Sequence, residues 1–149
     1  MPVRGRCMSK SPSRWIAEIE LQIQFFDLDP MEIVWHGNYV KYLEIARCAL
    51  LDTIDYNYVQ MKQSGYAWPI IDMHLRYAGA ATFGQRIKIR AEIVEWENRL
   101  KIDYVIRDAE TGRRLTRAST MQVAVDIATG EMCFVSPEIL LKKLGIATC

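Results

Sequence analysis

Apolar and polar residues alternate along five stretches of the chain, and this spacing gives the first expectation about its structure. In the stretch that starts at Trp15, the apolar side is formed by Ile19, Leu21, Ile23 and Phe25. A period of two residues is typical of a β-strand with one buried face. The same period predicts later strands over residues 67–77, 85–96, 100–107 and 115–127. Short turns join the last three of these, so we expect an antiparallel meander.

A helical period follows the first strand. Apolar residues recur at helical spacing from Asn38 to Ile54 and leave only a narrow polar stripe. A helix that is apolar over most of its circumference is expected to be wrapped by other structure. Asn38 has the residue type that N-caps prefer, and we interpret Cys48, inside the helix, as a small core residue. Residues 55–65 are predicted to be a polar link.

A second, short helix is predicted near the end of the chain. Ser136 is expected to be its N-cap, Pro137 suits its first position and Gly145 suits its C-cap. The order of strand, long helix, four strands and short helix describes one α+β domain, in which a sheet surrounds a helix. We assign this domain to residues 15–149 and interpret residues 1–14, which are polar and basic, as a flexible arm.

Composition narrows the class of protein. The 149 residues are half hydrophobic and a quarter charged, and the formal net charge is +1. This balance argues against nucleic acid or an anionic membrane surface as a partner. No apolar run approaches the roughly 20 residues that span a bilayer, and the N-terminus has no apolar targeting segment. We therefore expect a cytoplasmic protein without a transmembrane segment.

The cysteines indicate reduced thiols. Cys7, Cys48, Cys133 and Cys149 are widely spaced, include no C-x-x-C pair and have no neighbouring histidine. This pattern argues against a disulfide framework and a catalytic thiol. The chain also lacks the G-x-S-x-G, phosphate-loop and H-E-x-x-H motifs, which excludes serine hydrolases, nucleoside triphosphatases and zincins as readings of the sequence.

The candidate chemistry lies between the first strand and the long helix. Asp27 and Asp29 stand at the end of the strand, and His36 and Asn38 stand at the start of the helix. A helix N-terminus offers unpaired N–H groups and the positive end of the dipole, so it can stabilise an oxyanion while a carboxylate attacks or activates water. Carbonyl hydrolysis needs both parts.

Each of these residues also has a structural interpretation. Asp29 could form an Asx turn before Pro30, and Asp27 is expected to make a structural hydrogen bond where the backbone bends. His36 either donates to the substrate carbonyl or only fixes the helix start. A metal site at Asp27, Asp29 and His36 would lack the second histidine or cysteine usual for zinc, so we predict no metal.

The segment 27–47 resembles a known family. Its pattern D-x-D-P-x-x-[IV]-V-W-H-x-N-Y, followed by Tyr42, Glu44, Ala46 and Arg47, is similar to that of the hotdog-fold acyl-CoA thioesterases of the 4-hydroxybenzoyl-CoA thioesterase and YbgC-like type. The resemblance implies a hotdog domain, in which one curved antiparallel sheet wraps around a long central helix. It also implies hydrolysis of an acyl-CoA to free acid and CoA, with no cofactor other than the CoA of the substrate.

The same resemblance assigns roles to individual residues. It makes Asp29 the catalytic carboxylate, as nucleophile or general base, with His36 close to the carbonyl that the helix N-terminus polarises. It also implies homodimers or homotetramers with acyl sites at the subunit interface. Many family members have glycine where this chain has Glu32, and an acid there could narrow or repolarise the acyl pocket.

Substrate binding is assigned to a further set of residues. We expect Trp35 and Tyr39 to form core or pocket wall, with Asn38 orienting the active loop. CoA phosphates need cations, for which Arg99 and Lys101 are the candidates, with Arg76 as a third. A solvated sheet face is the alternative for these cations.

Two other functions remain open at this stage. The first is a non-catalytic binding module for acyl-CoA or acyl carrier protein, in which Glu32 spoils the site. The second is a hotdog dehydratase, although its histidine pattern is not found here. Glu44 and Arg47 are expected to pair within the helix, but Glu44 could instead reach a neighbouring subunit's site. The sequence does not specify the acyl group.

Overall fold

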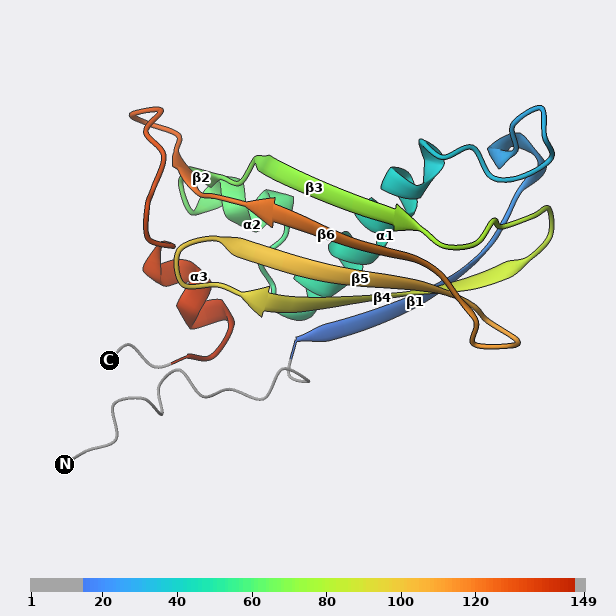
Figure 1. The fold of residues 1–149 in the computed structure, drawn as a ribbon. Coiled ribbons are helices and arrows are strands. Elements are labelled where there is room, and N and C mark those ends of the chain that lie inside the picture. The colour runs from blue at the N-terminus through green and yellow to red at the C-terminus, as the bar shows by residue number, and fades with distance from the viewer. Residues whose placement is uncertain (1–14, 147–149) are drawn as a thin grey trace.

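The computed structural model describes residues 15–146 and has the predicted α+β architecture (Figure 1). Its strands are β1 Ile16–Gln22, β2 Tyr66–Ala67, β3 Ile70–Tyr77, β4 Arg86–Glu95, β5 Leu100–Asp108, β6 Arg114–Gln122 and β7 Val125–Asp126. Its helices are α1 Asn38–Thr53, α2 Tyr58–Gln63, α3 Glu138–Lys143 and the 3-10 helix η3 Phe25–Asp27. The predicted arm, Cys7 and Cys149 lie outside the described residues.

Five of the strands form one antiparallel sheet in the order β1-β4-β5-β6-β3. Alternate residues of β4 and β5 are buried, as their sequence period predicts: Ile87, Ile89, Ala91, Ile93, Leu100, Ile102, Tyr104 and Ile106. The turns between β4, β5 and β6 confirm the predicted meander. One face of the sheet therefore supplies the core, and β3 is left as an edge.

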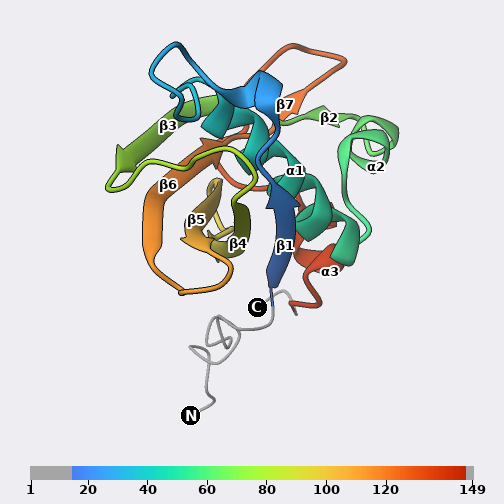
Figure 2. The same cartoon turned by 90° about the vertical axis from the view of Figure 1, so that its right-hand side faces the viewer.

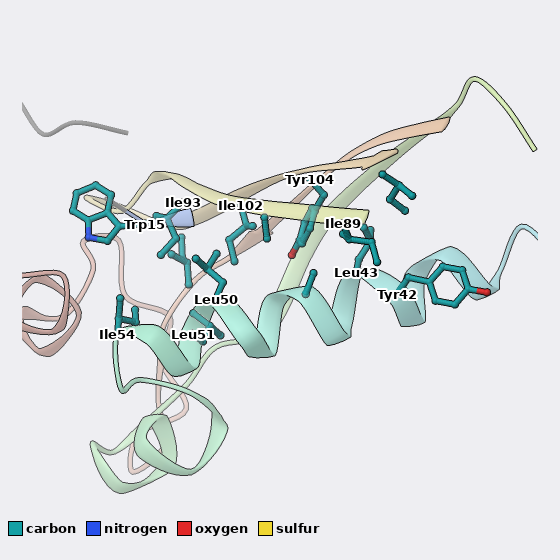
Figure 3. Packing of buried hydrophobic residues seen from close by; sticks show 14 of the residues in the cluster. Trp15, Tyr42, Leu43, Leu50, Leu51, Ile54, Ile89, Ile93, Ile102 and Tyr104 are labelled. Carbon is teal, nitrogen blue, oxygen red and sulfur yellow. The ribbon is translucent and has the colours of Figure 1, made fainter. Parts of the chain in front are cut away.

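Helix α1 lies across the buried face of this sheet, which curves around it (Figure 2). Leu43 and Leu50 point from the helix toward Ile89 and Ile102 of the sheet (Figure 3). Leu43, Leu50 and Ile102 are at most 1% exposed. This packing, together with the buried Tyr39 in the first turn, fixes where the N-terminus of α1 lies.

The other face of α1 is open in a single chain. Ile45 is 49% exposed and Cys48 is also exposed, so the placement of Cys48 in the core was wrong. The sheet covers only the face that carries Leu43, Ala46 and Leu50. The prediction of a helix wrapped over most of its circumference therefore fails for one chain alone.

Both predicted N-caps were displaced by one residue. Gly37 is the N-cap of α1, and Asn38 is the first helical residue. Pro137 precedes α3, while Ser136 is buried and its Oγ makes no hydrogen bond to any described residue. Gly145, with φ of 73°, follows the end of α3, where a left-handed residue is expected.

Three other stretches differ from their predictions. The expected polar link contains α2, which Asn57 caps by accepting a hydrogen bond from Tyr58 N at 2.7 Å. The long strand predicted over 115–127 breaks after Gln122, and β7 then pairs with β2 in a separate two-stranded sheet. Phe25 is 78% exposed, because β1 ends at Gln22 and Phe25 lies in η3.

Among the described helices, none is long and apolar enough to cross a membrane. The finding agrees with the expectation from hydropathy.

Candidate functional site

Asp29 lies in a tight hairpin between η3 and α1. Leu28 and Val34 form an antiparallel bridge, and Asp29 N donates to Ile33 O at 2.8 Å. The side chain is partly buried, and its Oδ1 accepts a hydrogen bond from Met31 N at 2.8 Å. This is the Asx turn that the sequence allowed. It occupies one carboxylate oxygen, and the catalytic role of Asp29 stays a prediction.

Glu32 completes this hairpin in a conformation that favours glycine. Its φ is 65°, and its N–H donates to Asp29 O at 2.9 Å. A side chain in the left-handed region crowds its own backbone. Glu32 thus stands where many members of the resembling family have glycine, and glycine would relieve the backbone strain at this position.

Asp27 holds the hairpin to both neighbouring elements. Its Oδ2 accepts from Gln24 N at 2.8 Å, which confirms the predicted structural hydrogen bond. Its carbonyl accepts from Trp35 N at 3.0 Å and from Asn38 Nδ2 at 2.8 Å. Asn38 thus orients the loop, as expected, without being the helix cap.

The start of α1 carries no side-chain cap and no acidic residue in its first turn. Gly37 lies under the Trp35 ring: a Cβ there would lie 2.8 Å from Cε3 and closer still to two other ring carbons. The Trp35 ring in turn lies 5.2 Å from the His36 ring. The positive end of the helix dipole is therefore left for an external anion, next to an exposed aromatic pair.

Tyrosines surround the inner side of this helix start. Tyr39 is buried and its ring lies 5.2 Å from that of Tyr77, whose hydroxyl donates to His36 O at 2.9 Å. Burial raises the pKa of Tyr39, opposed by a hydrogen bond with the Ala81 backbone. Burial also raises the pKa of Tyr42 strongly, and the nearby Asp27 carboxylate raises it further. Tyr39 and Tyr42 therefore keep their hydroxyl protons near neutral pH.

Two of the predicted CoA-binding cations, Arg99 and Lys101, lie far from the Asp29 hairpin in the same chain. Gln85 O, just before β4, accepts from Ile23 N at 2.9 Å, so the hairpin of Asp29 joins the start of β4. Lys101 of β5 lies opposite Glu95 in the strand register, at the other end of β4. At roughly 3.3 Å per residue, this end is about 30 Å away. Arg99 Nε is held there by Glu95 Oε1 at 3.3 Å. One chain therefore does not bring these cations to Asp29.

A cavity of about 640 Å³ lies on the open side of α1, away from the Asp29 hairpin. Its wall combines α1, α2, β2, β7 and the end of β6. The lining residues include Cys48, Met61, Trp68, Gln122 and Val125. Glu44 and Arg47 also line it, and their predicted ion pair is confirmed at 2.5 Å. No pattern in the sequence signals this cavity, because its wall joins elements far apart in the chain.

Within residues 15–146 no group of three or more histidine, cysteine, aspartate or glutamate side chains could hold a metal ion. Asp27 and Asp29 instead accept hydrogen bonds from backbone N–H groups.

The sequence matches known proteins over most of its length. Residues 23–142 match the family model of the thioesterase-like superfamily. A Synechocystis protein named "Putative esterase sll0410" is 30% identical over 132 residues, covering 88% of this chain and 79% of that protein.

Two solved structures share the fold. A 1,4-dihydroxy-2-naphthoyl-CoA thioesterase from Synechocystis has a TM-score of 0.78 at 20% identity, covering 87% of this chain and 96% of that one. A 4-hydroxybenzoyl-CoA thioesterase, an aspartate-to-asparagine mutant complexed with 4-hydroxybenzoyl-CoA, has a TM-score of 0.75 at 17% identity, covering 87% and 99%. The likeness confirms the predicted hotdog fold.

Proposed function

Because this chain belongs to the thioesterase-like superfamily, we propose that it hydrolyses an acyl-CoA thioester to a free acid and CoA. Membership confirms the prediction of a thioester hydrolase. The CoA substrate is supported by the two solved structures of the same fold, both of which are acyl-CoA thioesterases. The observation that carries the proposal is the Asp29 hairpin, tied by Asp27 to a helix start without a side-chain cap.

In this proposal Asp29 acts on the thioester carbonyl. Its carboxylate either attacks the carbonyl carbon or takes a proton from the attacking water. The oxyanion points at the first turn of α1, where the dipole and N–H groups stabilise it. The tetrahedral intermediate then expels CoA as a thiolate, a good leaving group that needs no strong acid. In the general-base route this step yields the free acid, whereas in the nucleophilic route it leaves an acyl anhydride on Asp29, which water hydrolyses to the free acid and the original carboxylate. His36 lies at the same helix start and is the candidate second donor.

A second copy of the chain would complete the site. Strand β3 is an unpaired sheet edge and carries the exposed apolar residues Ile70, Ile71 and Tyr77. Antiparallel pairing of β3 with its own copy about the strand centre sets Ile70 of one subunit beside Tyr77 of the other. We therefore propose a homodimer, which could pair again into a homotetramer.

This pairing would bring the cavity and the hairpin together. At one end of β3, Trp68 and Pro69 of the cavity wall directly precede Ile70. At the other end, the Tyr77 hydroxyl donates a hydrogen bond to the His36 carbonyl. The Asp29 hairpin of one subunit would then face the cavity of its partner, which would receive the acyl group. Exposed apolar residues around the hairpin, Phe25, Phe26, Met31 and Phe83, would also gain cover.

The test is replacement of Asp29. Asp29→Asn keeps an oxygen that can accept from Met31 N, so the turn should persist, while a carboxylate nucleophile or base is lost. We expect kcat to fall about 1000-fold or more on a panel of acyl-CoAs, followed by release of free thiol. Asp108→Asn is the matched control, because Asp108 Oδ1 accepts from Glu110 N at 2.8 Å in an equivalent turn. Equal rates for Asp29→Asn and the wild type would overturn the catalytic assignment of Asp29. A wild type that releases no thiol from any acyl-CoA would instead favour an acyl-CoA or acyl-carrier-protein binding module.

A further inference from the structure

The free edge strand β3 carries two opposite charges at equal distances from His74 (Figure 1). Asp72 lies two residues before His74, and Arg76 lies two residues after it. Met73, beside His74, pairs with Thr120, which is 2% exposed on the core face of the sheet. Because side chains alternate along a strand, the three polar residues lie on the outer face. An acid and a base are therefore placed symmetrically about His74.

Arg76 has no acidic partner in its own chain. Its guanidinium makes no hydrogen bond or ion pair with any described residue. The residue directly opposite on β6 is Arg117, and like charges in this position are destabilising. Asp103 lines the same hollow of the outer face as the two arginines, but within the described residues it forms no ion pair with either. An acid from outside the chain would offset this repulsion.

Asp72 has a carboxylate oxygen to offer at the same edge. Its Oδ2 lies 3.1 Å from Nε2 of His74, and its Oδ1 makes no hydrogen bond within residues 15–146. The Asp72 side chain is 49% exposed, so a group that lies beside β3 can reach it. The edge therefore presents an unpaired cation and a partly free anion four residues apart.

A two-fold axis limits how β3 pairs with its own copy. In an antiparallel pair this axis is perpendicular to the sheet, so it keeps outer-face residues on the outer face. Residues directly opposite each other share a face, so the axis must lie at the level of one residue rather than between two. Centring on His74 sets Asp72 of each subunit opposite the partner's Arg76. On the inner face, it sets Met73 opposite the partner's Leu75.

The neighbouring centres leave Arg76 without an acid. Centring on Leu75 sets Arg76 opposite the partner's His74. Centring on Met73 sets Arg76 opposite the partner's Ile70, which is apolar. Opposite charges that face each other across a strand pair are stabilising. Of these three registers, only the one centred on His74 therefore gives both charges a partner.

We propose that Asp72 and Arg76 select a second copy of this chain as the partner of β3 and fix its register, with the two His74 residues at the axis. This inference rests on the homodimer of the proposed thioesterase. Tyr77 then meets the partner's bulge between Ile70 and Asp72. Moving the centre by one residue slides the partner by two, about 7 Å along the strand. The charges therefore set where the partner's cavity lies relative to the hairpin of the proposed active site.

Cross-linking through introduced cysteines reads the register directly. Two residues opposite each other in antiparallel strands have Cα atoms about 4.5–5.5 Å apart, within the range that a disulfide spans. His74→Cys should therefore give a covalent dimer under mild oxidation, above the background of the native thiols in the wild type. Met73→Cys is the matched control, because its two copies lie about 8 Å apart and should not link. A linked Met73→Cys dimer, or no link in His74→Cys, overturns the inference.

Charge reversal tests the selection of the partner. Asp72→Arg and Arg76→Asp each set like charges opposite each other at both sites, so their dissociation constants in analytical ultracentrifugation should rise about tenfold or more. An equimolar mixture should dimerise as tightly as the wild type, because arginine faces aspartate at both sites of the mixed dimer. Asp103→Arg makes the same change of charge on β5, away from the edge, and should leave the constant unchanged. A mixture no tighter than its separate variants, or a monomeric wild type, overturns the inference.

Failure of the proposed hydrolysis is separable from failure of this inference, because thiol release and cross-linking are measured independently. A wild type that releases no thiol, together with a His74→Cys variant that links, overturns the thioesterase proposal and supports the inference. An active wild type with no link at position 74 does the reverse.

Discussion

The left-handed conformation of Glu32 makes a quantitative prediction about the active hairpin. Glu32 and Asp55 are the non-glycine residues with positive φ within residues 15–146, and Glu32 is the one beside Asp29. The left-handed region costs a residue with a Cβ roughly 1–2 kcal/mol. Replacement by glycine removes this cost but adds about 0.5–1 kcal/mol of unfolded-state entropy. Glu32→Gly should therefore be more stable than the wild type by up to about 1 kcal/mol.

Glu32→Ala separates the backbone effect from the loss of charge. Alanine removes the carboxylate but keeps the Cβ, so it gains nothing from relief of strain. The free energy of unfolding, from urea titration, should be about 1 kcal/mol higher for the glycine variant than for the alanine variant. In thermal unfolding this corresponds to about 2–4 °C in Tm.

A second glutamate in a turn gives the control. Glu110 is exposed and does not have a positive φ, so Glu110→Gly should lose about 0.5–1 kcal/mol where Glu32→Gly gains. A glycine variant at position 32 that is less stable than the alanine variant would refute the strain argument. Activity answers a different question: if the carboxylate repolarises the acyl pocket, kcat/KM should change equally in both variants.

Three further predictions concern the core, the pH response and the subunit interface. Leu50→Ala, at a 0% exposed position of α1, should destabilise the protein by about 3 kcal/mol in urea titration, while Cys48→Ser on the open face should change it by less than about 0.5 kcal/mol. Burial raises the pKa of Tyr104 to about 12, so the folded state holds a proton that the unfolded chain loses above pH 10. The free energy of unfolding should therefore fall between about pH 10 and 12, and it should fall less steeply in Tyr104→Phe. An equal slope in the two proteins would contradict this. Mixing inactive Asp29→Asn with cavity-filling Ala67→Trp should restore activity at about a quarter of the sites in randomly exchanged dimers, because each mixed dimer has one site with an intact hairpin and an open cavity. No recovery of activity would place the hairpin and the cavity in separate sites.

Local patterns predicted most of the fold because each depends on residues close in sequence. The alternation of β4 and β5 identifies their buried faces, and the apolar period after Asn38 identifies α1. Helix α2 was missed because its six residues, Tyr58–Gln63, are too few for a helical period to stand out. Asn57 caps it, and Gln60 Oε1 accepts a hydrogen bond from Asn57 N at 3.0 Å, which completes a capping box that the polar composition concealed.

The site was only partly predictable, because its parts come from distant segments. The short path from Asp27 to Asn38 indicated that the aspartates lie beside the helix start, and the hydrogen bond from Asn38 Nδ2 to Asp27 O joins them. The hairpin between them was not predicted. The cavity around Gln122 and Trp68 depends on contacts over 54 positions, which no periodicity records. The exposure of Cys48 depends on which face of α1 the sheet covers, and an almost uniformly apolar helix does not reveal that face.

The sheet order has a consequence for how the chain assembles during synthesis. Strand β1 is made first, yet its partner β4 lies 64 to 76 positions later, with α1 between them. The apolar face of α1 therefore stays exposed to solvent during synthesis until β4 and β5 have been made. Such long-range closure slows folding and exposes sticky surface to other nascent chains. The architecture that encloses the central helix thus leaves the newly made chain open to aggregation until the sheet is complete.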